Sequence, residues 1–482
     1  MMFLRSQFNS KKKCLVNGAI FLLTLIAALG MAWPIYRVFF KVVIDCNEGW
    51  NAFFDTAAMH GTLYPSPEQL ITNNYPPLSF YFVGFFGRLL GDVILAGRLI
   101  SLLSVLFIGF FIGKLIEQLG GSFRDATTGS AFFIATMGLF FPGYVGMNDP
   151  QLLAQCIMLG GTLLFLKTIA QERTPWAGLA TMIIAGFVKH NIITLPFSIL
   201  LWLLLRGEKK MFAKCLLVAA SFIAAGFMLC YWRYGHDFFF NFFSSRRFFP
   251  SQDLAALIDL SSILLPAAVA FFILWNKRTN QGALLILIIM VVGTMVLFLQ
   301  RLGSGVDVNG QFDLNIAVAA AAGLAFHFLS DPSLSWKKTS KETLQLSFLL
   351  VLLLPFLCAP ELHQIPQIFS RSFYQEAKRR ENIVLQEVQK IHDIPGDVFC
   401  ENSICYRAGK PFVVDCFNLN ERIKTGKISP FVVTDLINNH LLTKIVCNPD
   451  ITWPPYQATF LDNLKSPFQH WTEFEECYSQ SR

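Results

Sequence analysis

The chain has 482 residues, of which 54% are hydrophobic and only 15% charged, and its formal net charge is +7. A soluble domain carries roughly a quarter charged residues, so this composition excludes an ordinary soluble globular protein. No basic tract has the density of a nucleic-acid-binding arm, which argues against a nucleic-acid partner. Several apolar runs approach the ~20 residues that a helix needs to cross a bilayer. The chain is therefore predicted to be a polytopic α-helical membrane protein.

The first apolar stretch, residues 15–35, follows the basic residues Lys11, Lys12 and Lys13. Lys and Arg concentrate in loops that stay cytoplasmic, so the N-terminus is predicted to be cytoplasmic. A cleaved signal peptide is the alternative, but the length of the stretch and the many later spans favour a retained membrane helix. This helix delivers residues 36–96, the predicted first external loop, to the outer face.

Two acids, Asp45 and Glu48, come directly after this first span. Ionisable residues at a membrane are costly and commonly functional. The alternative is a pair of solvated loop acids. Tyr64, Asn74 and Tyr75 lie in the same loop and are candidates for binding a substrate.

Segment 76–92 is apolar but short, opens with Pro76 and Pro77, and carries Arg88. It could span the membrane or lie along the interface as an amphipathic helix. If it lies flat, most basic loop residues stay inside; if it spans, the distribution inverts. The flat arrangement therefore predicts about 11 transmembrane helices. After the first span, these cover residues 97–116, 125–143, 150–168, 176–188, 192–206, 212–232, 257–275, 281–299, 312–330 and 343–360.

Further polar residues return to the same outer face. They are Asp149 in an Asn-Asp-Pro turn, the adjacent Lys189 and His190, Arg301 and Asn309. Asp149 could simply cap a helix, and Lys189 could reach a lipid headgroup. No histidine has ligand-like spacing, so no metal site and no cofactor are predicted, and a dependence on divalent metals is left open.

Acids and cations on one face suit a reaction between a lipid phosphate and a hydroxyl or amine. Cations stabilise the phosphate as it leaves, and a carboxylate accepts the proton of the nucleophile. Lys189, His190 and Arg301 are the candidates for binding the donor phosphate, and the membrane bundle offers a groove for a lipid tail.

From residue 361 the composition becomes an ordinary polar mixture, which predicts a small extracytoplasmic α/β domain over residues 361–482. Expected helices cover residues 371–392 and 431–442, and expected strands cover 397–400, 412–416 and 444–447. Cys400 and Cys405 lack the spacing of a zinc site, so a structural role is expected, and a disulfide in this domain is plausible if it faces an oxidising compartment.

The motifs of residues 10–330, in their order and spacing, resemble those of the GT-C glycosyltransferases. The likeness is greatest to the protein mannosyltransferase and aminoarabinose transferase branch of bacterial membrane enzymes. It rests on Asp45 and Glu48, Gly61-Thr62-Leu63-Tyr64, Asn74-Tyr75-Pro76-Pro77-Leu78, Gly97-Arg98-Leu99, Asn148-Asp149-Pro150 and Asn309.

This resemblance implies a GT-C-like transmembrane catalytic module, placed at residues 1–360, with interfacial helices in the first external loop. It also implies a polyprenyl-phosphate-linked monosaccharide as donor and inversion at the anomeric carbon. The expected location is the bacterial inner (cytoplasmic) membrane, with the C-terminal domain in the periplasm.

The resemblance places the first-loop acid of the family on Asp45 or Glu48 and the second acidic motif on Asp149. Family members often have adjacent acids in the first loop, whereas here Asn47 precedes Glu48 and Asp45 lies two positions before Asn47. Asp45 is preferred as the catalytic base, with Glu48 orienting it or the acceptor.

Two other classes of function are compatible with a polytopic membrane protein. A lipid or sugar transporter or flippase would keep its functional polar groups near the bilayer midplane, whereas here they lie at one face. A membrane-anchored assembly subunit would act through its tail. Neither the sugar nor the acceptor, whether glycan, lipid or protein, is indicated by the sequence.

Overall fold

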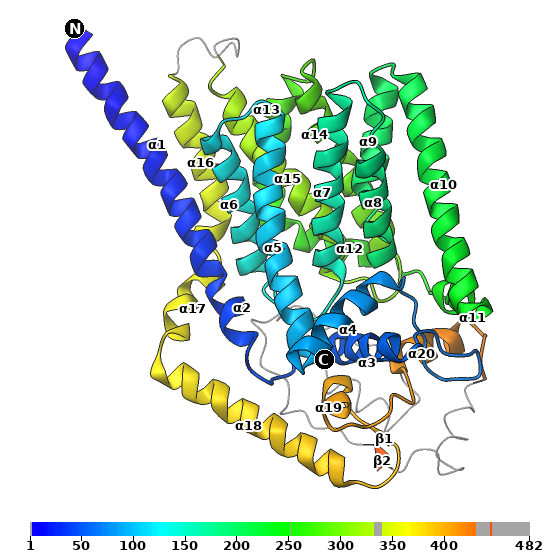
Figure 1. Cartoon of the computed structure of the whole chain (residues 1–482). Helices are drawn as coiled ribbons and strands as arrows, with labels where there is room; N and C mark the ends of the chain where they lie inside the picture. The colour runs from blue at the N-terminus through cyan, green and yellow to red at the C-terminus, as the bar shows by residue number, and fades with distance from the viewer. Residues whose placement is uncertain (1, 251, 332–339, 430–443, 446–482) are drawn as a thin grey trace.

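The structure is a computed structural model that describes residues 2–250, 252–331, 340–429 and 444–445. Most of these residues form a bundle of helices that run side by side (Figure 1). The bundle contains α1 (Met2–Gly30), α5 (Val93–Gln118), α6 (Phe123–Phe140), α7 (Gln151–Ile169), α8 (Trp176–Val188), α9 (Thr194–Leu205), α10 (Lys209–Tyr234), α13 (Ser261–Trp275), α14 (Gln281–Arg301), α15 (Phe312–Phe328) and α16 (Lys341–Leu357). Each of these helices overlaps a predicted span.

Five of the described helices are long and apolar enough to cross a bilayer, or six spans when the bent pair of α16 and α17 (Pro360–Ile368) is counted as one. Helices α8, α9 and α13 are apolar but shorter. The protein is therefore a multi-pass membrane protein, and the number of about 11 crossings stays a prediction.

Close helix packing at the centre depends on small residues. Helix α15 is buried along almost its whole length, including the run Ala317–Ala322. The side chain of Ile116 on α5 lies between Gly129 on α6 and Gly323 on α15. A Cβ at Gly129 would lie 2.4 Å from Ile116 Cδ1, and a Cβ at Gly323 would lie 2.3 Å from the same atom. Small residues allow helix backbones to approach closely inside a membrane bundle.

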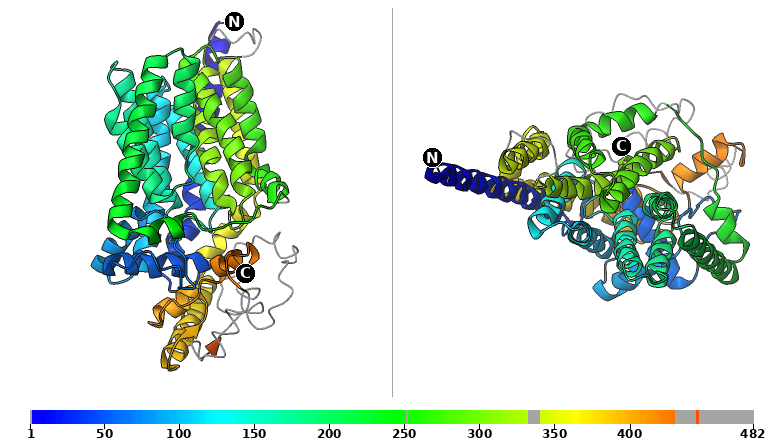
Figure 2. Two further views of the ribbon diagram at one scale, coloured as in Figure 1. Left: turned by 90° about the vertical axis from the view of Figure 1, so that its right-hand side faces the viewer. Right: turned by 90° about the horizontal axis from the view of Figure 1, so that it is seen from above.

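Short helices cover one end of the bundle: α2 (Ala32–Arg37), α3 (Cys46–His60), α4 (Leu78–Leu90), α11 (His236–Phe242), α12 (Gln252–Asp259) and the 3₁₀ turn η1 (Val308–Gln311). Figures 1 and 2 show α3 and α4 lying across the bundle end. Helix α4 has 13 residues, which corresponds to a length of about 20 Å. This is shorter than the ~30 Å hydrocarbon core, in agreement with a segment 76–92 that lies flat.

Helix α3 has clear start and stop signals. Asp45 caps its first turn by accepting a hydrogen bond from the Asn47 N–H. Gly61 ends it in the left-handed region at φ 80°, a conformation that glycine adopts without strain. The cap fixes the backbone on which Asp45 and Glu48 stand.

The C-terminal part begins with α18 (Arg371–Asp393) and continues through β1 (Val398–Phe399), α19 (Asn402–Arg407), α20 (Cys416–Lys424) and β2 (Lys444–Ile445). Strands β1 and β2 pair in parallel, with Val398 opposite Lys444. Cys400 and Cys405 form a disulfide. The predicted strand 412–416 is wrong, because only Val414 pairs, in an isolated bridge with Leu70, and α20 begins at Cys416. The predicted helix 431–442 lies outside the described residues.

Candidate functional site

Glu48 is fully buried and binds the buried guanidinium of Arg98 on α5. The Arg98 Nε and Nη2 atoms donate to its two carboxylate oxygens at 2.7 and 2.6 Å. The backbone N–H groups of Ile44 and Asn148 donate to the same oxygens. Arg98 also donates to the carbonyls of Phe40 and Val42. A carboxylate that accepts this many hydrogen bonds, two of them from a guanidinium, is oriented rigidly.

The Asn148-Asp149-Pro150 turn is held by α3. Asn51 Nδ2 donates to the Asn148 carbonyl at 2.8 Å, and Asn148 Nδ2 donates to Asp55 at 3.1 Å. Asn148 also fills the space above Gly97, where a Cβ would lie 1.8 Å from its Oδ1. Helix α3 thus positions the turn that carries Asp149.

Asp149 and Lys189 form a second buried ion pair, with Lys189 Nζ at 3.0 and 3.3 Å from the two carboxylate oxygens. The Gln151 N–H donates to Asp149 at 2.7 Å, and Lys189 Nζ lies 4.7 Å from the centre of the Tyr75 ring. Burial lowers the pKa of Lys189, but its interactions with Asp149 and Tyr75 together outweigh this effect and raise the pKa overall. Lys189 is therefore charged at neutral pH.

Asp45 is a partly exposed carboxylate at the same end of the bundle. Burial and the negative charges of Asp307, Glu48 and Asp149 raise its pKa to about 6, against the hydrogen bond from Asn47 that lowers it. Asp307 accepts a hydrogen bond from the Tyr144 hydroxyl at 3.0 Å. Burial and the charges of Asp307, Asp149 and Asp45 raise the pKa of Tyr144. Asp45, Asp149 and Asp307 therefore lie close enough to one another for their charges to interact.

A group of aromatic and basic residues adjoins Lys189. The His190 ring lies 6.3 Å from the Tyr75 ring and 5.1 Å from Phe242. Burial and the charges of Lys189 and Arg246 lower the pKa of His190 to about 4. Contrary to its expected role as a cation, His190 is neutral at pH 7 and can meet a phosphate only as an N–H donor.

The remaining candidates have mixed positions. Arg301 donates to Asp259 at 3.0 Å and lies 3.7 Å from Asp307, so its charge is already compensated. The Tyr64 hydroxyl donates to the Tyr75 carbonyl, which gives Tyr64 a structural contact. Asn74 is partly exposed next to Tyr75. Asn309 is buried, and its Oδ1 has no hydrogen-bond partner among the described residues.

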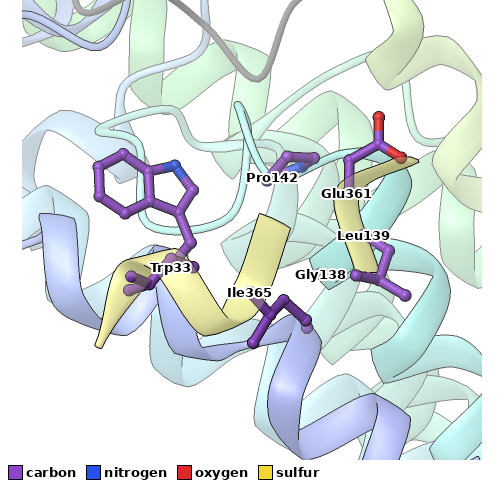
Figure 3. Close-up of a pocket in the computed structure, with 8 residues that line it drawn as sticks. Trp33, Gly138, Leu139, Pro142, Glu361 and Ile365 are labelled. Carbon is purple, nitrogen blue, oxygen red and sulfur yellow. The ribbon is translucent and has the colours of Figure 1, made fainter. Parts of the chain in front are cut away.

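Two hollows lie elsewhere, against α1 and α17. One is a recess of about 10 Å³, about the space of one water molecule; Figure 3 shows Trp33, Pro142 and Glu361 around it. The other is an apolar groove of about 450 Å³ between residues 22–29 and 357–369. Neither lining includes a predicted site residue. Within the described ranges, no group of three or more His, Cys, Asp or Glu side chains could hold a metal ion.

Sequence reasoning overlooked the roles of several residues. An arginine inside the long apolar stretch 93–118 requires a buried partner, and this signal could have led to the Arg98–Glu48 pair. Tyr144 carries no distinguishing local pattern. Asp307 is one of several acids in its loop, and no local pattern distinguishes it from them.

Known proteins resemble the chain in sequence and in fold. Residues 74–232 match the family model described as dolichyl-phosphate-mannose-protein mannosyltransferase. No curated protein sequence matches the chain significantly. Among solved structures, ArnT from Cupriavidus metallidurans in the apo state has a TM-score of 0.57 at 15% identity, over 88% of this chain and 91% of that chain.

Two further structures extend this comparison. ArnT from the same organism bound to undecaprenyl phosphate has a TM-score of 0.59 at 15% identity, over 87% of this chain and 91% of that one. The Archaeoglobus fulgidus oligosaccharyltransferase, tethered with an acceptor peptide, has a TM-score of 0.50 at 10% identity, over 83% of this chain and 64% of that one. The chain therefore has the GT-C fold, and the matching family and structures are glycosyltransferases.

Proposed function

We propose that this chain, built on the GT-C fold, is an inverting glycosyltransferase. It moves a monosaccharide from a polyprenyl-phosphate donor to an acceptor at the outer face of the membrane. Support for the donor class comes from the fold shared with a protein that binds undecaprenyl phosphate. Support for the chemistry comes from the carboxylates and the buried lysine at one end of the bundle.

Asp45 is proposed as the general base. An acceptor O–H or N–H attacks the anomeric carbon, and its proton passes to the Asp45 carboxylate. The bond between this carbon and the phosphate oxygen breaks, and the prenyl phosphate leaves with the electron pair. A base with a pKa of about 6 is largely ionised at neutral pH and still accepts a proton readily.

The cations are proposed to stabilise the leaving phosphate. Lys189 can rotate from Asp149 toward the phosphate, and Tyr75 lies beside its ammonium group. His190 adds a neutral donor, while Arg301, Asn309, Tyr64 and Asn74 are proposed to shape the space around the sugar. Oriented charges at the position where negative charge develops are usually the largest catalytic contribution.

Glu48 is proposed to act as a positioning residue rather than as the base. Its two oxygens already accept four hydrogen bonds. Asp149 is proposed to hold Lys189 in place. In this assignment only one of the three predicted catalytic acids touches the nucleophile.

The single observation that carries the proposal is the partly exposed Asp45, whose pKa is raised by burial and by the charges of Asp307 and Asp149. Asp45→Asn tests it, with Asp92→Asn as a matched control. Both aspartates cap helices through backbone N–H groups, and Asn retains this capping ability. Purified protein is incubated with radiolabelled prenyl-phosphate sugars and a membrane extract.

We expect Asp45→Asn to reduce transfer by about 10²–10⁴-fold, the usual contribution of a general base, and Asp92→Asn to stay near the wild-type rate. Both variants should purify and melt like the wild type. Full transfer by Asp45→Asn would remove the assignment. No sugar transfer by the wild type to any acceptor in the extract would remove the proposed function.

A further inference from the structure

A segment of the C-terminal part, residues 414–422, packs on the loops of the membrane bundle. Val414 forms a parallel bridge with Leu70, and the Asp415 N–H donates to the Leu70 carbonyl at 3.0 Å. Arg422 donates to the carbonyls of Pro67 and Gln69 at 2.9 and 3.0 Å. These contacts fasten the segment along the first external loop.

Asp415 joins the same segment to α3. Its buried carboxylate accepts a hydrogen bond from the Trp50 indole at 2.9 Å, and it caps α20 by accepting from the Asn418 N–H. Trp50 stands on the helix that carries Glu48. The beginning of α20 is therefore fixed to the helix at the centre of the site.

Glu421 binds two residues of further loops, Arg247 and Ser304. Its side chain is 1% exposed, and one oxygen accepts from Arg247 Nε, Arg247 Nη2 and Ser304 Oγ at 3.1, 2.7 and 2.9 Å. The other oxygen accepts from the Arg247 backbone N–H at 2.8 Å. A buried carboxylate bound in this way holds the backbone of residue 247 as well as its side chain.

Arg246 precedes this fixed residue and lies close enough to His190 for its charge to lower the pKa of that imidazole. Its guanidinium lies 4.7 Å from the Phe417 ring of α20, and its Nη1 is buried without a hydrogen-bond partner among the described residues. Phe417 reaches this position only because residue 305 is glycine. A Cβ there would lie 2.3 Å from the Phe417 ring.

We infer that Glu421 is a positioning residue of the transfer reaction, which fixes Arg247 so that the unpaired Nη1 of Arg246 meets the phosphate of the lipid-linked donor. The inference rests on the proposed function. If Glu421 acts in this way, the C-terminal segment 414–422 is a part of the donor site. A protein truncated before residue 414 would therefore lack this part of the site.

Glu421→Gln in the full chain tests this inference, with Glu387→Gln as a matched control. Glu387 is also a buried acid of the C-terminal part, but its partner is the exposed Lys390 on the same helix. We expect Glu421→Gln to raise KM for the prenyl-phosphate sugar at least about tenfold, the effect of one charged hydrogen bond. The value of kcat should change much less, and the control should leave both constants unchanged.

A double variant separates positioning from general stability. If Glu421 acts through Arg246, Arg246→Ala combined with Glu421→Gln should raise KM no more than Arg246→Ala alone. Independent sites give additive effects. Binding of prenyl phosphate without sugar, followed by tryptophan fluorescence, should weaken in the same pattern. If Glu421→Gln fails to fold, Ser304→Ala removes a single bond to Glu421 and should raise KM a few-fold.

An unchanged KM in Glu421→Gln would overturn the inference. Where that variant fails to fold, an unchanged KM in Ser304→Ala would do the same. Additive effects of the two substitutions in the double variant would also overturn it. In those cases the wild type would still transfer sugar, so the proposed function would stand. A wild type that neither binds prenyl phosphate nor turns over the donor would instead remove the proposed function itself.

Discussion

Two buried ion pairs lie at the same end of the bundle and differ in how they are built. Glu48 and Arg98 meet through two parallel hydrogen bonds, and Arg98 also binds two backbone carbonyls. Asp149 and Lys189 meet through a single ammonium group beside the Tyr75 ring. Arginine holds a carboxylate in a planar fork, whereas lysine is a point charge on a flexible stem.

We expect this difference to separate a structural pair from a functional one. The first pair joins α3 to α5, and each guanidinium nitrogen of Arg98 already donates to Glu48 or to a backbone carbonyl. The second pair has an ammonium group that we propose turns toward an incoming phosphate. A count of charged residues does not distinguish the two pairs, whereas their hydrogen bonds do.

Removing Arg98 should have the largest effect on stability. Arg98→Ala leaves Glu48 and the carbonyls of Phe40 and Val42 buried without their donor. Breaking a buried pair in this way costs ~3–5 kcal/mol, so we expect a strongly lowered melting temperature and a low yield of folded protein. Arg98→Lys should recover only part of this loss. Wild-type stability of Arg98→Ala would show that the pair does not brace the fold.

Removing Lys189 should instead affect activity. Lys189→Met is expected to lower kcat/KM about 100-fold, a typical loss when one oriented donor to developing charge is removed. The melting temperature should fall less than in Arg98→Ala, because Asp149 keeps the Gln151 N–H. Equal losses of stability in the two variants would contradict the distinction between the pairs.

Gly97→Ala perturbs the turn that connects the pairs. The new Cβ would collide with Asn148, which donates to Glu48 and precedes Asp149. Overpacking of this kind costs ~1–3 kcal/mol, and we expect a several-fold loss of transfer through the displaced Asp149. Gly91→Ala is a suitable comparison, since no atom lies within 4 Å of a Cβ there. Because residue 91 has φ 73°, Gly91→Ala should lower the stability of the protein but leave its transfer activity unchanged.

The smallest effect near neutral pH is expected from the titration of Asp45, which belongs to neither pair. Its raised pKa of about 6 means that the carboxylate is ionised above this pH and protonated below it. A base must be ionised, so kcat/KM should fall about tenfold per pH unit below pH 6 and level off above it. A profile that stays flat from pH 5 to 8 would exclude Asp45 as the base.

Each predicted span overlaps a helix of the bundle, because apolar runs with polar ends mark such helices in the sequence, and the number that cross the bilayer stays a prediction. The prediction that segment 76–92 lies flat rested on its Pro-Pro start and on the distribution of basic loop residues. The predicted strand at 412–416 failed because its apolar residues do not pair in a sheet but pack against the first external loop.

The candidate site was predicted less completely. Asp45, Asp149 and Lys189 were chosen as candidates because acids and cations following apolar spans are unusual, and the structure joins two of them, Asp149 and Lys189, in an ion pair. The contacts of Arg98 and Glu421 could not be derived, since the chain places their partners 50 and 174 residues away. Such distant pairings leave no local periodicity or motif in a single sequence.

The hydrogen bond between Trp50 and Asp415 connects residues that lie 365 positions apart. During synthesis, a nascent polypeptide that has already inserted all of its bundle helices still lacks Asp415, Phe417 and Glu421. The early loops therefore lack these contacts until residues 415–421 have been synthesised. Nascent chains halted before residue 415 should accumulate as inserted but incomplete intermediates.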